Sequence, residues 1–323
     1  MKSLTVTEYG ESDVLQVAET DRPEPGEGEV LIEVKAAGIN FADIMQRRGH
    51  YHGGPEPPYT PGMEVAGVIA EVGDGVNREP GESVVSLVNG GGYAEYAIAD
   101  ARGLLAIPDG LEFDEAAGFP VQWLTAHNCL HEWGELESGE TVLVHAAAGG
   151  VGSAAVQLAD EAGATVIGTA STEEKLSMAT DLGMDHGIRY TEEDFVERVD
   201  EITEGDGVDL VLDGIGADTS DESLDALCSF GRMVSYGAAG GEPGRPNTAD
   251  LLFGNNRIIG YHLGRAINEK PMRVMGAVPE LTELLAEGVL EVQIGHTFDL
   301  EAAADAHQFI EDRNSSGKVV LLP

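Results

Sequence analysis

The segment 141–164, TVLVHAAAGGVGSAAVQLADEAGA, constrains the fold more than any other stretch of the chain. A short apolar run stops at a turn of alanine and glycine, and a small-residue amphipathic run follows it, which predicts a strand, a turn and a helix. Gly149, Gly150 and Gly152 would permit a tight turn, close approach of the backbone to a pyrophosphate, and close packing of the helix on the strand. Ala147 occupies the first glycine position of such a turn, so the segment alone also fits a role in packing only.

Strands and helices alternate downstream of the turn. We predict strands at 165–169, 186–190, 208–212, 232–236 and 257–263, and helices at 172–182, 192–203 and 218–229. This alternation predicts a parallel sheet with helices on both faces. The glycine turn follows the first strand of that sheet, where a dinucleotide-binding turn belongs, and the N-terminus of the next helix would point its N–H groups at phosphates.

The first hundred residues have a different character, because short β-rich runs are broken by glycine and proline at hairpin-like intervals. They predict a mainly β lobe that forms a partly closed barrel. A helix at 272–287 precedes a terminal strand at 317–322 that is apolar enough to be buried, most economically against the first lobe. We therefore predict an α/β protein with a catalytic domain from 1–122 and 265–323 and a doubly wound, Rossmann-type domain at 123–264.

Composition restricts the partners and the environment of the chain. The formal net charge is −40, the acidic residues are scattered along the sequence, and only five of the 18 basic residues are lysines. Dispersed acid with little lysine is typical of proteins from extreme halophiles, so we predict an activity optimum in molar salt. Nucleic acid is an unsuitable partner, since no basic cluster is present.

The remaining compositional signals concern location. No apolar run approaches the roughly 18 residues that cross a bilayer, and the N-terminal segment lacks the order of a signal peptide. Cys129 and Cys228 are far apart and permit neither a disulfide framework nor zinc-ribbon spacing. We predict a cytoplasmic protein without membrane contact.

Five motifs occur in order along the chain. They are AAGINFAD at 36–43, PYTPGMEVAGVI at 58–69, GGYAEYAI at 91–98, VHAAAGGVG at 144–152 and GKVVLLP at 317–323. Together they resemble the medium-chain dehydrogenase/reductase superfamily, in its zinc-free quinone oxidoreductase branch, the zeta-crystallin-like group. The resemblance implies a GroES-like catalytic domain beside the Rossmann-type domain.

The resemblance also bears on metal binding. Zinc-dependent alcohol dehydrogenases of the superfamily hold their catalytic zinc with a cysteine after an AAGIC-type motif and a histidine in a GHE motif, but Asn40 and Met63 stand at these places here. The cysteine-rich loop of the structural zinc is also absent. His127 and His131, four residues apart on a predicted helix, are a possible metal pair, but Cys129 would point elsewhere on that helix. We expect no zinc and no other metal site.

The predicted cofactor is NADPH. NAD-binding units place a carboxylate about 20 residues beyond the glycine turn, whereas here the second strand ends in the neutral pair Ala170-Ser171. Glu173 and Glu174 on the next helix fit surface charge but leave NAD open. The resemblance implies that Thr125 holds the nicotinamide carboxamide and that Lys175, among others, contacts the 2′-phosphate. The full set of expected cofactor-binding residues is Thr125, Ala148, Gly149, Gly150, Val151, Gly152, Ser171, Lys175, Tyr190 and Arg313.

The expected reaction is hydride transfer from NADPH to a quinone without metal or flavin. Without zinc, hydrogen bonds must polarise the substrate oxygen. The resemblance implies that Asn40 lies beside the nicotinamide and that Tyr51 and Tyr59 line the quinone site, although both tyrosines also fit packed aromatic side chains. No carboxylate or histidine stands out in the sequence as an obligatory proton carrier, and a reduced quinone can take protons from water.

Two other functions stay open. The same sequence pattern fits NADPH-dependent reduction of an activated alkene, an enal or enone, by hydride attack on the β-carbon. It also fits, less well, a non-enzymatic nucleotide-binding protein of the crystallin kind.

The segment 257–263 is predicted to be an apolar edge strand. Members of the family commonly dimerise through the corresponding strand, so the resemblance implies a homodimer.

Overall fold

The computed structural model describes residues 1–323 and contains two compact units. The first unit comprises residues 1–121 and 282–323, and the second comprises residues 122–281. The second unit therefore interrupts the first in sequence. No helix of the structure is both long enough and apolar enough to span a membrane.

The first unit is built on a seven-stranded sheet in which β14, β15, β3, β4, β5 and β7 are neighbours in that order and β6 pairs with β3. A separate antiparallel pair joins β1 and β2. The strands of this unit are β1 (Lys2–Val6), β2 (Leu15–Glu19), β3 (Glu29–Ile39), β4 (Glu64–Val72), β5 (Ser83–Leu87), β6 (Tyr96–Asp100), β7 (Leu104–Ala106), β14 (Ile294–Asp299) and β15 (Lys318–Leu322). Its helices are α1 (Phe41–Arg47), α2 (Phe113–Ala117) and α12 (Ala303–Glu311), with 3-10 turns at Ser12–Val14, Ala101–Gly103 and Leu300–Ala302.

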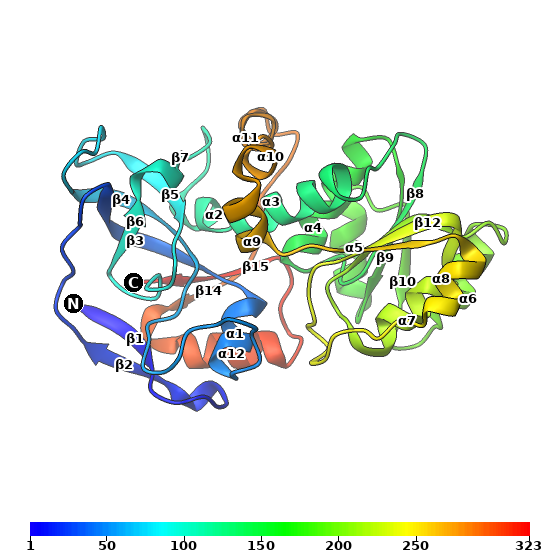
Figure 1. The fold of residues 1–323 in the computed structure, drawn as a ribbon, viewed down its shortest axis with the longest axis horizontal. Helices are drawn as coiled ribbons and strands as arrows, with labels where there is room; N and C mark the ends of the chain where they lie inside the picture. Colours follow the sequence, from blue (N-terminus) through cyan, green and yellow to red (C-terminus); the bar gives the residue numbers. More distant parts are fainter. The chain divides into compact units, whose positions relative to one another are not determined.

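Strand β3 organises this unit because it pairs with three strands. β4 runs along one edge of β3, while β6 and the C-terminal strand β15 share the other edge. Figure 1 shows β15 in red, running back into the sheet beside β3. The chain's end thus returns to the first lobe, as the apolar terminal run predicts, and buried residues from β1, β3, β4 and α12 form the core.

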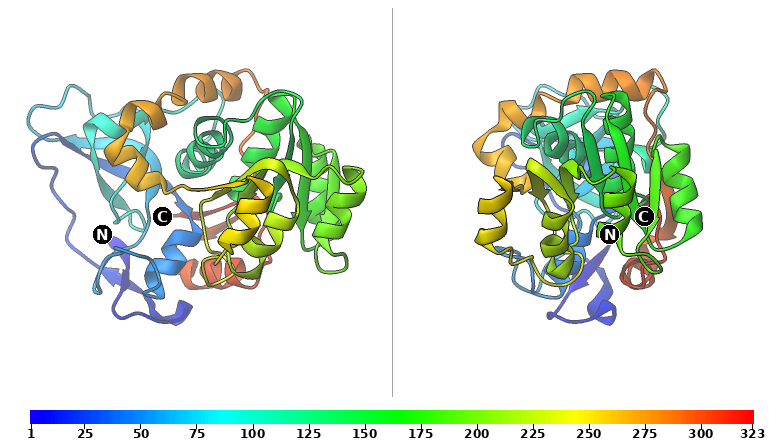
Figure 2. Two further views of the ribbon diagram at one scale, coloured as in Figure 1. Left: turned by 45° about the vertical axis from the view of Figure 1, so that its right-hand side comes forward. Right: turned by 90° about the vertical axis from the view of Figure 1, so that its right-hand side faces the viewer.

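The second unit contains a six-stranded parallel sheet in the order β10-β9-β8-β11-β12-β13. This is the 3-2-1-4-5-6 order of a Rossmann-type sheet, so the predicted fold class is confirmed. Figure 2 shows helices on both faces of the sheet. The strands are β8 (Thr141–Val144), β9 (Thr165–Ala170), β10 (His186–Arg189), β11 (Val208–Asp213), β12 (Leu227–Ser235) and β13 (Arg257–Gly260). The helices are α3 (Pro120–His127), α4 (Gly150–Glu161), α5 (Glu173–Asp181), α6 (Phe195–Ile202), α7 (Ala217–Asp225), α8 (Thr248–Gly254), α9 (Leu263–Glu269), α10 (Pro271–Met275) and α11 (Val278–Ala286).

Several predicted elements differ from the structure in where they begin or end. The helix predicted at 218–229 ends at Asp225, because strand β12 already begins at Leu227 and pairs with β11 there. The helix predicted at 272–287 is two helices, α10 and α11, which are separated by Gly276 and Ala277. The predicted strand 257–263 keeps sheet pairing only to Gly260.

Residues 265–281 lie in the second unit, although the sequence places them with the first domain. Side chains around α10 explain this position. Arg273 bonds Glu132 at 2.7 Å and stacks 4.3 Å from the Trp133 ring, and Asn128 donates to the carbonyl of Val274. The two hydrogen bonds join residues 141 and 146 positions apart, which sequence periodicity cannot pair.

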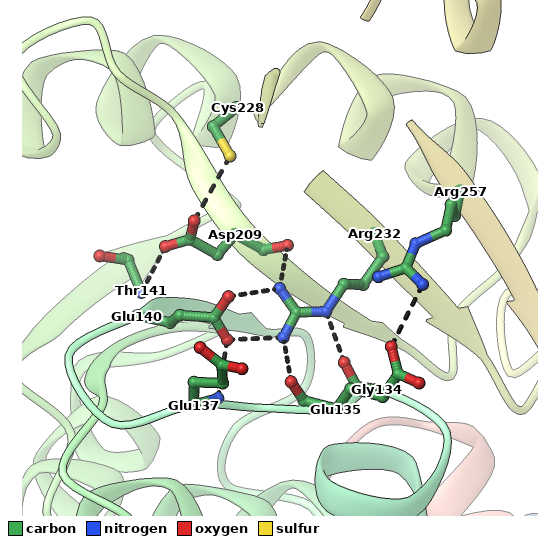
Figure 3. A network of polar contacts seen from close by, with 9 residues as sticks. All are labelled: Gly134, Glu135, Glu137, Glu140, Thr141, Asp209, Cys228, Arg232 and Arg257. Atoms are coloured by element: carbon green, nitrogen blue, oxygen red, sulfur yellow. Dashed lines mark hydrogen bonds and ion pairs between the residues drawn. The ribbon is translucent and has the colours of Figure 1, made fainter. Parts of the chain in front are cut away.

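A buried arginine fastens the loop before β8 to the sheet (Figure 3). The guanidinium of Arg232, on β12, contacts both carboxylate oxygens of Glu140 at 2.8 and 2.6 Å. It also donates to the carbonyls of Asp209, Glu135 and Gly134. A fork of this kind satisfies several backbone acceptors with one side chain. It fixes the start of β8, and hence the strand that leads into the glycine turn.

Candidate active site

The glycine turn connects β8 to α4 by unusually close backbone approaches. Ala146 has a left-handed φ of 50°, and the N–H of Gly149 donates to its carbonyl at 2.7 Å. A Cβ on Gly152 would lie 2.1 Å from the oxygen of Ala146, and one on Gly150 would lie 1.8 Å from Nε2 of Gln122. Residue 152 must therefore be glycine, because the clash is with the backbone, whereas a side chain at residue 150 would require the end of the Gln122 side chain to move. No side chain caps the N-terminus of α4 and its first turn holds no acidic residue, so this terminus suits a phosphate.

The buried side chain of His145, at the start of the turn, contacts residues of β9 and α7. Nδ1 of His145 lies 3.1 Å from the hydroxyl of Thr169, and Nε2 lies 2.8 Å from that of Ser223. Because the Ser223 hydroxyl donates to the carbonyl of Thr219, it accepts from Nε2–H of the ring, and Nδ1 accepts from Thr169. Burial lowers the pKa of His145 to about 4, against the opposing charge of Asp213. The neutral ring thus joins the ends of β8 and β9 to α7.

The predicted 2′-phosphate residues are only partly brought together. Thr191, which follows Tyr190, donates its hydroxyl to the carbonyl of Ser171 at 3.1 Å, so the ends of β9 and β10 are adjacent. Lys175 lies in the first turn of α5, and the Tyr190 side chain is exposed. Arg313 belongs to the first unit, where it follows α12 with a left-handed φ of 58°.

The predicted carboxamide ligand lies on α3. Thr125 is buried on this helix, three residues after Gln122, the side chain that the turn approaches at Gly150. Ala148 is buried and Val151 is half-buried, both within the turn itself. Thr125 and the turn therefore both belong to the second unit, in which Gln122 of α3 lies against the turn at Gly150.

In the first unit, Asn40 is bonded at both ends of its amide group. Lys318 Nζ donates to Asn40 Oδ1 at 2.9 Å, and Asn40 Nδ2 donates to Glu64 Oε1 at 2.8 Å. Lys318 and Glu64 also form an ion pair in which both side chains are completely buried. A lysine can only donate and a carboxylate only accepts, so the pair fixes the orientation of the amide. Asn40, Glu64 and Lys318 form a triad that does not use the second amide N–H of Asn40. That N–H can donate to a substrate oxygen.

Two further contacts tie this triad to its surroundings. The second oxygen of Glu64 accepts the backbone N–H of Val121, at the start of α3, at 2.9 Å. A Cβ on Gly38 would lie 2.6 Å from Cε of Lys318 and 2.7 Å from Oε1 of Glu64. The triad therefore fits against a bare stretch of β3 and could not form next to a larger residue.

A second buried polar group adjoins the triad. The backbone N–H of Asn40 and the hydroxyl of Tyr93 both donate to Asp43 Oδ2, at 2.8 and 3.0 Å. Tyr93 Oη also lies 3.2 Å from Nε2 of His307 on α12. Burial raises the pKa of Asp43 to about 6, although the hydrogen bonds from Asn40 and Tyr93 oppose the shift. Burial lowers the pKa of His307 to about 3, with Arg47 as a further cause.

The two predicted tyrosines lie in the field of this carboxylate. Burial and then the charge of Asp43 raise the pKa of both Tyr51 and Tyr59. Tyr59 is fixed by two backbone hydrogen bonds with Val6, and its buried hydroxyl has no partner in the structure. Tyr51 is half-buried in the loop that follows α1.

His127 and His131 of the second unit have ring centroids 4.8 Å apart. His127 ends α3, but His131 lies in a following π-helical turn, Asn128–Glu132, so their spacing is not that of an α-helix. His127 Nε2 lies 3.6 Å from a carboxylate oxygen of Glu280. No group of three or more histidine, cysteine or acidic side chains in the structure is arranged to hold a metal ion.

Sequence reasoning missed most of the polar groups around Asn40, although the motifs contained them. The missed residues are Asp43, Glu64, Tyr93, His307 and Lys318. Four of these five lie inside the motifs that carry the family resemblance, and only His307 lies outside. A usable signal was the rarity of lysine, since Lys318 is one of five lysines in an acidic chain and yet is buried.

Comparison with known proteins identifies the family of the chain. Residues 26–109 match the family model of the alcohol dehydrogenase GroES-like domain, and residues 150–283 match that of the zinc-binding dehydrogenases. The solved structure of Escherichia coli quinone oxidoreductase complexed with NADPH is 35% identical, with a TM-score of 0.95 and 100% of both chains covered. The chain belongs to the medium-chain dehydrogenase/reductase superfamily. Within the superfamily it falls in the quinone oxidoreductase branch, as the motifs predict.

Other members of the superfamily show its functional range. A 2-haloacrylate reductase from Burkholderia is 39% identical, covering 93% of this chain and 92% of that protein. A quinone oxidoreductase from Pseudomonas aeruginosa is 34% identical, with 100% and 99% covered. The synaptic vesicle membrane protein VAT-1 homolog of Danio rerio is 35% identical, with 99% and 69% covered. Similarity at this level shows an oxidoreductase fold and family, and the substrate has to be argued from the site.

Proposed function

We propose that the protein is an NADPH-dependent quinone oxidoreductase that needs neither metal nor flavin. The observation that carries the proposal is the Asn40 amide, which Glu64 and Lys318 hold where zinc-dependent members have a metal ligand in sequence. A fixed amide N–H can polarise a substrate oxygen in place of a metal ion. When bound, NADPH would supply the hydride.

The second unit contains a suitable set of groups for this cofactor. The glycine turn and the uncapped start of α4 would bind the pyrophosphate, and Thr125 would hold the nicotinamide carboxamide. The 2′-phosphate would be bound by Ser171, Lys175, Tyr190 and Arg313. The end of β9 is neutral and leaves room for this phosphate. The NADPH complex of the Escherichia coli relative supports this choice.

The first unit supplies the groups that act on the substrate. Asn40 would donate its second amide N–H to the substrate oxygen as negative charge develops there. Tyr51 and Tyr59 would line the substrate site, and their raised pKa values keep both phenols protonated. These side chains can therefore donate hydrogen bonds throughout the neutral pH range.

Reduction of an activated alkene is the second candidate. The specific observation in its favour is the 2-haloacrylate reductase, which is 39% identical to this chain over 316 residues. An enone or acrylate carbonyl would use the same Asn40 donor while the β-carbon accepts hydride. A nucleotide-binding protein without catalysis is a third candidate, and it predicts cofactor binding with no oxidation by any acceptor.

The deciding experiment is a panel of acceptors assayed with NADPH in molar salt. Comparable concentrations of 1,4-benzoquinone, a 2-alkenal and 2-chloroacrylate should be compared by kcat/KM. We expect the quinone to give the highest value, and a higher value for either alkene would assign the second function. The ratio of kcat/KM for NADPH to that for NADH should exceed one, and a preference for NADH would overturn the cofactor assignment.

A homodimer is proposed through the segment 257–263. Strand β13 (Arg257–Gly260) is the terminal strand of its sheet and pairs only with β12, so its other edge is unpaired. Such an edge can extend the sheet with that of a second copy. Light scattering in molar salt should give twice the mass of the 34.0 kDa chain.

A further inference from the structure

The backbone of Asn40 is held by a hydrogen bond of its own, besides those of its side chain. Asn40 immediately precedes α1, and the carboxylate of Asp43, the third residue of that helix, accepts the backbone N–H of Asn40 at 2.8 Å. This bond is the carboxylate half of a capping box. Asp43 is also completely buried, which is costly for a carboxylate unless hydrogen bonds satisfy it. Capping alone does not explain that burial, because an exposed residue can cap a helix.

A chain of hydrogen bonds connects Asp43 to helix α12. The Tyr93 hydroxyl donates to Asp43 Oδ2 at 3.0 Å, and its oxygen lies 3.2 Å from Nε2 of His307. A hydroxyl carries one proton, so an oxygen that donates it to a carboxylate accepts from the Nε2–H group. Burial lowers the pKa of His307 to about 3, so the ring is neutral and its one proton lies on Nε2. His307 therefore orients the Tyr93 hydroxyl, which orients the carboxylate of Asp43.

A buried ion pair joins the same two helices one turn further along. Arg47, four residues after Asp43, contacts Glu311, four residues after His307, at 2.5 Å. Arg48 also contacts Glu311, at 2.8 Å. Figure 1 shows α1 lying beside α12. The first two turns of α1 are thus joined to α12 by buried polar contacts at two levels.

The unused amide N–H of Asn40 needs this backbone support to have a fixed direction. Lys318 bonds Oδ1 of the amide, and Glu64 accepts one of its two N–H groups. Two such bonds define an axis through the amide, about which the planar group could still tilt. The backbone of Asn40 is a third fixed point, and it removes the tilt. The direction of the N–H proposed to meet the substrate oxygen therefore depends on the bond to Asp43.

We propose that Asp43, Tyr93 and His307 are positioning residues for the reduction and that they act by holding the backbone of Asn40. All three side chains are completely buried, and their effect reaches the substrate only through Asn40. The inference rests on the proposed function, because it takes Asn40 as the donor to the substrate oxygen. It gives helix α12 a part in the reaction. Quinones and activated alkenes would depend on it alike, since both would use the same donor.

The first test is Tyr93→Phe, which removes one hydroxyl from the middle of the hydrogen-bond chain. We expect kcat with NADPH and the best acceptor to fall about 10-fold, because the donor loses its orientation. The Kd for NADPH should stay at the wild-type value, since the glycine turn lies in the second unit. An unchanged kcat overturns the proposal.

Tyr9→Phe is the matched control for this variant. It removes a tyrosine hydrogen bond, to the carbonyl of Pro55 at 3.0 Å, in the same unit but outside the chain that ends at Asn40. We expect its kcat to equal that of the wild type. A fall as large as that of Tyr93→Phe would show that any lost tyrosine hydrogen bond in this unit lowers kcat, and it contradicts the proposal.

A double-mutant cycle with Asn40→Ala separates positioning from support of the fold. If Tyr93 acts through the Asn40 amide, Tyr93→Phe should change kcat by less than about 2-fold once that amide is absent. The losses from the two substitutions should therefore not multiply. Losses that do multiply in the variant carrying both substitutions mean that the Tyr93 hydroxyl serves the fold alone, and they overturn the proposal.

His307→Phe tests the far end of the chain and carries the same cycle if Tyr93→Phe does not fold. Phenylalanine keeps a ring where that of His307 makes an edge-to-face contact with Tyr93, but it lacks the Nε2–H donor. We expect kcat to fall about 3-fold, less than for Tyr93→Phe, because the Tyr93 hydroxyl can still bond Asp43. An unchanged kcat, or a loss that multiplies with that of Asn40→Ala, counts against the proposal.

The outcomes also separate this inference from the proposed function. A wild-type protein that oxidises NADPH with no quinone, alkenal or acrylate contradicts the proposed function. Wild-type kcat in Asn40→Ala removes Asn40 as the donor, and the positioning residues with it. An active wild type, a slow Asn40→Ala variant and multiplying losses contradict the positioning role alone.

Discussion

The candidate residues of the second unit and those of the first unit use different parts of the polypeptide. In the second unit, the glycine turn uses the backbone of one short segment, 146–152, in which Gly149 and Gly152 both approach the carbonyl of Ala146. In the first unit, the triad around Asn40 uses ionisable side chains, and one of its hydrogen bonds joins residues 278 positions apart. A backbone site can therefore form from local sequence, whereas a side-chain site requires the complete sheet.

The two regions also differ in how they manage charge. The start of α4 contains no charged side chain and depends on peptide dipoles. The first unit instead buries Glu64 and Lys318 completely and compensates each with hydrogen bonds. Removing one partner of such a pair leaves an unpaired buried charge, which is far more costly than a lost surface contact.

The largest effect should come from Lys318→Met, which breaks the buried pair. We expect a loss of about 3–5 kcal/mol in the free energy of unfolding, because the Glu64 carboxylate stays buried without its cation. Lys35→Met is the matched control, since the Lys35–Glu33 pair is exposed and should change stability by less than about 1 kcal/mol. Urea denaturation measures both, and equal losses would remove the contrast between the two kinds of pair.

Asn40→Ala should come next and should act on catalysis. We expect kcat/KM to fall roughly 10- to 100-fold, as removal of one positioned donor does. NADPH binding, measured by fluorescence titration, should stay near the wild-type value. An unchanged kcat/KM would exclude Asn40 from the mechanism.

Glycine substitutions test the backbone half of the comparison. A Cβ at Gly152 meets the carbonyl of Ala146 at 2.1 Å, so Gly152→Ala should lower stability by about 1–3 kcal/mol. Gly149→Ala is milder, because its Cβ would lie 3.1 Å from the same oxygen. The second variant should fold with a similar Tm and show a higher Kd for NADPH. If both variants bind NADPH as the wild type does, the turn does not bind the pyrophosphate.

The smallest expected effect is the pH dependence that His145 contributes. Its pKa is lowered from 6.5 to about 4 in the folded protein, so the unfolded chain binds more protons between these values and stability falls as pH falls. At pH 5 the loss from this group should be about 2 kcal/mol relative to pH 8. His145→Gln should flatten the urea midpoint across this range, whereas the exposed His186 should matter little when replaced in the same way. A wild-type slope in His145→Gln would assign the acid sensitivity elsewhere.

This contrast also explains what the sequence could predict. The strand, turn and helix around 141–164 follow from local spacing, and the alternation of elements follows from periodicity, so the fold class was predictable. The end of α7 was not predictable, because residues 227–229 belong to strand β12, which pairs with β11, although their own sequence pattern is that of a helix. Whether the predicted site residues act as proposed stays a prediction, which the variants above test.

Asp43 and His307 show most clearly which contacts could not be predicted from the sequence. Alone in the sequence, each reads as a polar residue on the surface of a short helix. Their role depends on α1 lying against α12 with Tyr93 between Asp43 and His307, which are 264 positions apart. Long-range packing of this kind leaves no local pattern in the sequence. The motifs that contain Asp43 and Tyr93 were the only sequence signal for these residues.

The position of β15 has a consequence for how the protein is made. Residues 318–322 occupy an interior place in the first sheet, between β14 and β3, and they carry the lysine that neutralises Glu64. A ribosome synthesises these residues after the whole second unit, so the second unit can fold while the first still lacks β15. We therefore expect the second unit of the nascent protein to fold before the first, with the carboxylate of Glu64 lacking its cation until Lys318 has been synthesised.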